Sequence, residues 1–186
     1  MVWEIEKWFK FINYQCSEAE LQKTLEFFSK EREEIRVQID NLSWSVDFEK
    51  QQQAIDYLST KLLPSEYVYL IMADKYQLKP FDNKTKYYRQ ATGKERWENA
   101  AKTIVKIGWP KVDSIIVPMF MWLLDPNWPG SEMIYDFMFT LPKDVLNEKI
   151  KLVLDNPQNY DHYNYLDLKE HLILLSEIIN ENGKND

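Results

Sequence analysis

The chain has 186 residues and a net charge of −7, and its length fits one globular domain that can bury a full core. Its single cysteine excludes an internal disulfide and a cysteine-based zinc site, and its four glycines exclude a glycine-rich phosphate loop. The first ten residues lack the basic start of a signal peptide, and no window of about 18 apolar residues occurs. We therefore expect a bacterial-type cytoplasmic protein with no membrane segment.

The first half of the chain predicts helices of uneven regularity. Residues 1–42 are expected to form an N-terminal helical arm, with a short helix over 2–12 and a long helix from Ser17 to about Asp40. Glu20 lies three residues after Ser17, which is the spacing of a capping box. Residues 43–93 predict a degenerate helix pair, in which Pro64 opens the second helix, followed by a loop over 76–93.

From residue 94 the apolar period becomes regular. A helix is predicted from Trp97 until Gly108, and the next apolar run, over 112–123, contains Pro118 and should be kinked there. Further helices are predicted to start at Pro129 and Pro142, and a last one covers 163–180. Short turns between helices of this length predict an all-α fold: a HEAT-like array of antiparallel helix pairs (an α-α superhelix) in a single domain, 1–186.

Two segments of the second half carry a family resemblance. Gly108–Lys111 reads GWPK, and Met121–Gly130 reads MWLLDPNWPG. This pattern resembles the bacterial domain of unknown function 5071, a helical family similar to HEAT repeats, over residues 94–180. Asp155 and Tyr160 lie near a further turn of the family pattern, with a longer spacing. The resemblance implies the fold and carries no activity.

The residues of the second segment also have a physical interpretation. We expect Asp125 to cap the following helix, Asn127 to suit the turn and Pro129 to fix φ at the helix start. Trp128 is expected to cover the seam between helix pairs, with Trp122 packed near it. The motif is thus interpreted as a structural turn, and the alternative is an exposed aromatic and acidic edge that grips a partner.

Catalytic and metal-binding patterns are weak in this chain. His162 and His171 are nine residues apart, so they do not lie on one helical turn, and Cys16 has no histidine near it in the sequence. An enzyme that uses His162 and His171 ranks last among the hypotheses. We expect no enzymatic activity, no cofactor and no metal.

Charge is distributed in three blocks, and this distribution favours a protein partner. Residues 1–74 and 112–186 are acidic, whereas residues 75–111 hold ten basic and three acidic side chains. The leading hypothesis is a non-catalytic protein-binding module, of an immunity or scaffold type, with a basic partner. Tyrosine suits protein contacts, and the expected contact residues are Tyr160, Tyr163 and Tyr165. The alternative is a nucleic-acid-binding HEAT-like protein, disfavoured by the net negative charge, that would use Lys84, Lys86, Arg89, Lys94 and Arg96.

Overall fold

The fold was analysed in a computed structural model that describes residues 33–44, 48–71, 95–159 and 162–182. Within these ranges all regular structure is helical and no strand occurs, which confirms the predicted all-α class. The helix expected over 2–12, the start of the long helix at Ser17 and the loop over 76–93 lie outside the described residues.

The α-helices have between 4 and 21 residues, and 3₁₀ turns precede or follow several of them. In chain order they are α3 (Glu33–Trp44), α4 (Phe48–Lys61), η2 (Pro64–Glu66), α5 (Val68–Ile71), α6 (Glu95–Ile107), η4 (Asp113–Ile115), α7 (Ile116–Met119), η5 (Phe120–Leu124), α8 (Ser131–Met138), α9 (Lys143–Leu154), η6 (Pro157–Asn159) and α10 (His162–Asn182). Pro64 begins the turn of helix that leads into α5, as its position in the sequence predicts.

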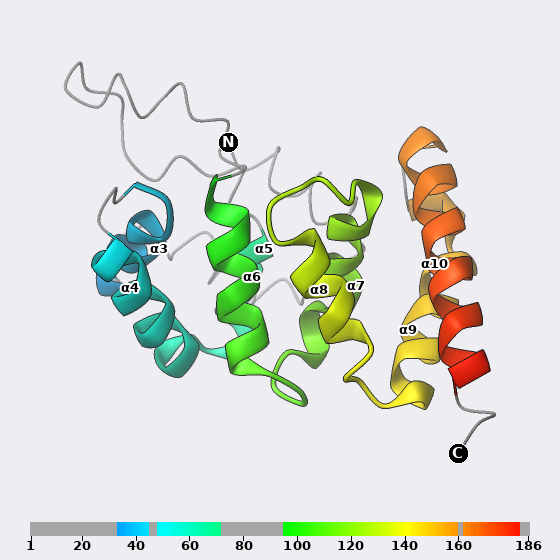
Figure 1. Cartoon of the computed structure of the whole chain (residues 1–186), viewed down its shortest axis with the longest axis horizontal. Coiled ribbons are helices and arrows are strands. Elements are labelled where there is room, and N and C mark those ends of the chain that lie inside the picture. Colours follow the sequence, from blue (N-terminus) through cyan, green and yellow to red (C-terminus); the bar gives the residue numbers. More distant parts are fainter. Residues whose placement is uncertain (1–32, 45–47, 72–94, 160–161, 183–186) are drawn as a thin grey trace.

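Along the longest axis of the molecule, α3 and α4 lie at one end, α5, α6, α7 and α8 in the middle, and α9 and α10 at the other end (Figure 1). At one end α3 packs on α4, and both pack on α6. In the middle α6 also contacts α5 and α8, and at the other end α10 packs on η5 and α9. Neighbours in space are therefore mostly neighbours in sequence, as in a stack of helices.

Helix α6 lies at the centre of this arrangement and shows why the apolar pattern folds as it does. Ala100, Ala101 and Ile104 are fully buried, and Ile104 follows the two alanines by four and three residues, so that the three side chains share one face of the helix. Gly108 ends the helix in the left-handed conformation (φ 71°), and its N–H donates to the Ile104 carbonyl at 3.0 Å. The predicted end of this helix at Gly108 is confirmed.

The apolar run over 112–123 forms three short pieces instead of one kinked α-helix. Backbone of α type covers only Ile116–Met119, and 3₁₀ turns precede and follow it. Pro118 lies within the α-helical piece, has no N–H to donate and crowds the carbonyl one turn earlier, which accounts for the irregularity. The predicted disturbance at Pro118 is thus present, but it affects the whole run.

One hydrophobic core joins the described helices. Its fully or almost fully buried members extend from Ile35 in α3 through Leu58, Ile104 and Phe120 to Leu175 in α10. The inward positions of α9 and α10 follow the sequence pattern: they are Leu146, Ile150, Val153, Leu168, Leu172 and Leu175. Burial of these faces against one another is the main stabilising contribution to such a stack.

Candidate functional site

Three tryptophans of the described residues meet where the loop over 125–130 touches α6. The rings of Trp97 and Trp128 are 4.6 Å apart between centroids and nearly perpendicular, at 73°. The Trp97 and Trp122 rings are 5.6 Å apart and tilted by 59°. Trp97 and Trp122 are buried, and Trp128 is partly buried. Edge-on contacts of this kind are the favourable arrangement of aromatic pairs, so the cluster fixes the loop against the helix.

Hydrogen bonds tie the same loop to η5. The indole Nε1 of Trp122 donates to the Pro129 carbonyl at 3.1 Å, and the Ser131 hydroxyl donates to the Trp122 carbonyl at 2.7 Å. Ser131 is buried, and its hydroxyl satisfies a carbonyl at the 3₁₀ end of the preceding run. Both contacts give the tryptophan motif a structural role in positioning α8.

Asp125 does not cap α8 as expected. Its Oδ1 atom accepts from the Asn127 backbone N–H at 2.9 Å and from the Asn127 side-chain amide at 3.0 Å, which closes an Asx turn inside the loop. Helix α8 begins at Ser131, two residues after Pro129, and its N-cap is Gly130 without a side-chain capping bond. Asp125 and Asn127 shape the turn, and the helix start lies too far along the chain for Asp125 to serve as its cap.

Gly130 allows the loop to approach α6 closely. It has a φ of 83°, and a Cβ atom placed there would lie 2.7 Å from the Ala101 Cβ and 3.0 Å from the Trp97 carbonyl oxygen. No side chain fits this space without movement of the helix backbone. The sequence motif therefore ends in a glycine because the backbone of α6 lies directly against it.

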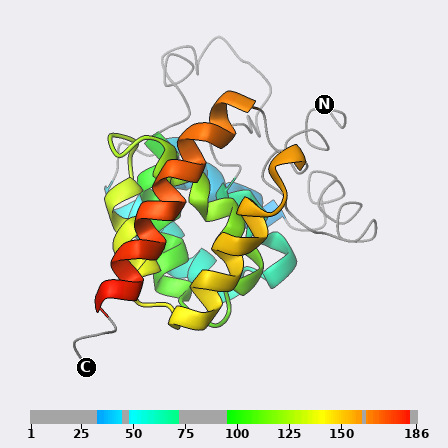
Figure 2. The ribbon, with the colours of Figure 1, turned by 90° about the vertical axis from the view of Figure 1, so that its right-hand side faces the viewer.

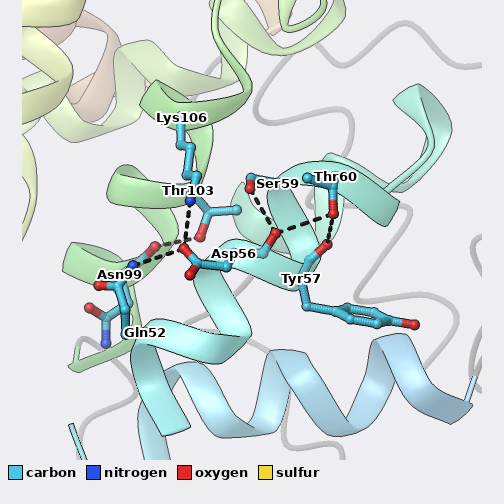
Figure 3. Close-up of polar contacts among 8 residues, drawn as sticks. All are labelled: Gln52, Asp56, Tyr57, Ser59, Thr60, Asn99, Thr103 and Lys106. Carbon is cyan, nitrogen blue, oxygen red and sulfur yellow. Dashed lines mark hydrogen bonds and ion pairs between the residues drawn. The ribbon is translucent and has the colours of Figure 1, made fainter. Parts of the chain in front are cut away.

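A polar seam joins α4 and α6 on the surface (Figure 3). Lys106 Nζ lies 2.5 Å from Asp56 Oδ1, and the Gln52 amide donates to the same oxygen at 2.9 Å. The Lys106 ammonium, and then the Gln52 amide, lower the pKa of the Asp56 carboxyl below its ordinary value. The Ser59 and Thr60 hydroxyls donate to backbone carbonyls one turn earlier, among them that of Asp56. The contact of this seam that crosses between the two helices is the Lys106–Asp56 ion pair, and because both side chains are about half exposed it contributes little to their association.

Asn99 makes a buried connection below that seam. The Asn99 side-chain amide donates to the Leu42 backbone carbonyl near the end of α3 at 2.7 Å, and the Asn99 backbone carbonyl accepts from the Thr103 hydroxyl at 2.7 Å. Asn99 and Thr103 are both buried. The bond to Leu42 satisfies one of the carbonyls that have no partner within a helix at its C-terminal end.

The last described helix, α10, carries apolar side chains on two faces. Leu168, Leu172 and Leu175 are buried in the core, whereas the exposed side chains Leu166, Ile173 and Leu174 retain 44%, 39% and 52% of their accessible surface. Acidic residues share the exposed side of the helix, and they are Asp167, Glu170, Glu177 and Glu181. The stripe predicted from the sequence is the buried one, and the apolar residues outside that stripe were a signal in the sequence for the second face.

The three tyrosines expected to contact a partner have different positions. Tyr160 lies outside the described residues, and Tyr163 lies in the first turn of α10 with a side chain that is not described. Tyr165 is partly buried, and its hydroxyl donates to the Leu154 carbonyl at the end of α9, at 3.2 Å. Tyr165 thus connects α9 to α10, and contact of these tyrosines with a partner stays a prediction.

Most of the basic block expected to contact nucleic acid lies outside the described residues, namely Lys84, Lys86, Arg89 and Lys94. Arg96 belongs to α6, and its side chain is not described. Further along α6, Lys102 pairs with Glu98 at 2.6 Å, and Lys106 pairs with Asp56. These two cations are already neutralised by acidic neighbours, which weakens their attraction for phosphate.

Among the described residues, no three histidine, cysteine, aspartate or glutamate side chains gather closely enough to hold a metal ion. His171 lies on α10 and is partly buried, whereas the side chain of His162 and the whole of Cys16 lie outside the described part. None of the helices in the described ranges is both long and apolar enough to cross a membrane.

Comparison with known proteins found no matching family model, no similar curated protein and no similar solved structure. The resemblance to the bacterial domain of unknown function 5071 therefore stays a prediction. What the chain does must be inferred from its own helices and their surfaces.

Proposed function

We propose that the helices form a HEAT-like array, as the resemblance implies. Two pairs of consecutive helices that pack on one another support this proposal, namely α3 with α4 and α9 with α10. Helices α6 and α8, which are separated in the chain by α7, also pack on one another in the middle of the molecule (Figure 1). An array of this kind presents extended helical faces, which are suited to binding large partners.

We infer that the protein is a non-catalytic binding module whose partner is a basic protein, as in immunity-type or scaffold proteins. The observation that carries this inference is the charge of α10, which has four exposed acidic residues and a single lysine, Lys169. An acidic helix attracts basic partners and speeds their association by complementary charge. Acidic residues are also in excess over the whole chain, which gives the net charge of −7.

The alternative, nucleic-acid binding through the basic block, has less support. Two lysines of this block have described ion pairs: Lys102 pairs with Glu98, and Lys106 pairs with Asp56. A nucleic-acid phosphate that contacts these lysines would have to compete with their carboxylate partners. The acidic α10 would repel the other phosphates of the nucleic acid.

Three defined probes test the proposed function. They are a synthetic peptide of about 14 residues with leucine on one helical face and lysine on the other, the same peptide with glutamate in place of lysine, and duplex DNA. We expect the full chain to bind only the lysine peptide in fluorescence anisotropy. Raising the salt from about 0.15 M to about 1 M shortens the Debye length from about 8 Å to about 3 Å and should weaken that binding.

Two results would count against the proposal. Equal binding of the lysine and glutamate peptides would show that charge does not select the partner. Salt-dependent binding of the duplex DNA that is lost when Lys84, Lys86 and Arg89 are reversed to glutamate would favour the nucleic-acid alternative instead.

A further inference from the structure

The outer face of α10, defined here by Leu166, Glu170, Ile173, Leu174 and Glu177, combines apolar and acidic side chains. All five are exposed. Ile173 and Leu174 follow Leu166 by seven and eight residues, so they lie about two turns beyond Leu166 on the same side of the helix. Glu170 and Glu177 each follow an apolar member by four residues and so lie next to it on the same side.

This composition is unusual for the end of a helical stack. A single exposed leucine needs no explanation, because apolar atoms make up much of any protein surface. Helices at the ends of stacked arrays, however, normally present a polar outer face, since no further helix covers them. Figure 2 shows α10 and α9 nearest to the viewer, at the end of the row of described helices. An apolar ridge at this place indicates a surface on which another helix packs.

Among the described helices, those at the two ends of the molecule do not suit a second copy of this chain as the occupant of the ridge. In a symmetric contact each α10 would face another α10, and Glu170 and Glu177 would lie close to acidic residues of the other copy. In a head-to-tail contact α10 would face α3 or α4. Helix α3 carries three acidic residues and one arginine, and α4 carries two acidic residues and two lysines. Neither helix offers the excess of positive charge that would complement α10.

We propose that the outer face of α10 docks an amphipathic helix of a basic partner protein, with apolar side chains on one face and lysine or arginine on both sides of them. The apolar residues of that helix cover Leu166, Ile173 and Leu174, and its cations pair with Glu170 and Glu177. A partner helix laid along α10 uses the i, i+3, i+4, i+7 pattern by which helices recognise helical surfaces. This inference rests on the proposed function and adds the place and the form of the contact.

Two double variants of the full chain test the two components of this surface. Ile173→Ser with Leu174→Ser removes the apolar ridge, and Glu170→Lys with Glu177→Lys reverses the charge. All four positions are exposed, so the fold should persist, which circular dichroism checks. Each variant is titrated with the lysine peptide and the glutamate peptide described above.

Single-residue controls place changes of the same kind elsewhere in the molecule. Leu63→Ser alters a leucine that is 51% exposed, against 52% for Leu174, at a site between α4 and η2. Asp136→Lys reverses an exposed acid on α8. Both controls should bind the lysine peptide as the wild type does, whereas each α10 variant should bind it at least about ten-fold more weakly. The charge-reversed α10 should in addition gain affinity for the glutamate peptide.

The possible results distinguish a wrong docking site from a wrong proposed function. If the wild type binds the lysine peptide and the α10 variants bind it equally well, the docking site is wrong and the proposed function stands. If the wild type does not bind the lysine peptide, the proposed function itself fails. If sedimentation shows a dimer of the wild type that Leu174→Ser dissolves, the occupant is a second copy, and the proposal of a basic partner helix is overturned.

Discussion

A methyl group added at Gly130 should destabilise the protein more than the same group added at Gly108. Both glycines have a positive φ, 83° and 71°, so both variants adopt a conformation that alanine disfavours. Their surroundings differ. The new Cβ at position 130 would lie 2.7 Å from the Ala101 Cβ and 3.0 Å from the Trp97 carbonyl oxygen, whereas at position 108 the nearest atom, the Val105 oxygen, is 3.6 Å away.

The magnitude follows from this difference. The left-handed backbone conformation costs alanine about 1–2 kcal/mol in either variant. Replacing glycine also restricts the unfolded chain, which stabilises both variants by about 0.4–1 kcal/mol. Only Gly130→Ala adds overpacking, which costs about 1–3 kcal/mol because the backbone of α6 must shift to make room. We therefore expect Gly130→Ala to lose about 1–3 kcal/mol more stability than Gly108→Ala, since the terms that both variants share cancel.

Urea denaturation followed by circular dichroism and by tryptophan fluorescence measures the two free energies of unfolding. The midpoint should fall further for Gly130→Ala at an unchanged slope, because the area exposed on unfolding stays the same. The two variants also serve as controls for each other, since both replace a left-handed glycine at a helix end. Stabilities that agree within about 0.5 kcal/mol would show that the loop over 125–130 does not press on α6, and would refute the reasoning.

Changes at three other contacts have defined outcomes. Asn99→Ala removes the donor to a carbonyl near the end of α3 and should cost about 1–3 kcal/mol in the same assay; an effect near zero would mean that water replaces the amide. Trp128→Ala should cost about 2 kcal/mol, less than the 3–5 kcal/mol or so of a fully buried tryptophan, and unchanged stability would contradict its edge contact. In an NMR titration the pKa of the Asp56 carboxyl should lie below its ordinary value and rise in Lys106→Met. The lowered pKa stabilises the fold only while the Asp56 carboxyl is ionised, so the free energy of unfolding should fall as the pH drops through that pKa. Asp56→Asn removes the carboxyl and should reduce this dependence of stability on pH. A pKa that is equal in wild type and Lys106→Met would remove the ion pair as the cause.

The parts of the fold that the sequence predicts well are those governed by local periodicity. The spacing of Trp97, Ala100 and Ile104 predicts α6 and its buried face, and the glycine at position 108 predicts its end. Helix α9 follows from the same rule. In each case one apolar stripe faces one core, so the pattern of a single segment contains the information that the structure uses.

The features that the sequence does not predict depend on contacts between distant segments, which are not encoded in the local pattern of one segment. The position of Asp125 a few residues before α8 suggests a helix cap. The chain makes a further tight turn that brings Gly130 against α6, and the Asp125 carboxyl accepts a hydrogen bond from Asn127 inside the loop instead. The exposed leucines of α10 are similar: which of its two apolar faces is buried depends on where η5 lies. Long-range packing decides both features.

The stacking of α10 on α9 and η5 also affects how the protein opens. Helices at the end of a stack can unfold locally without disturbing the far end, because each contacts mainly its neighbours. Amide hydrogens of α9 and α10 should then exchange with solvent through partial openings, while those of α6 exchange only through wider ones. A ligand held on α10 lowers the population of the open form and should slow exchange in these two helices first. Exchange rates along the chain would therefore show which end of the molecule a partner occupies.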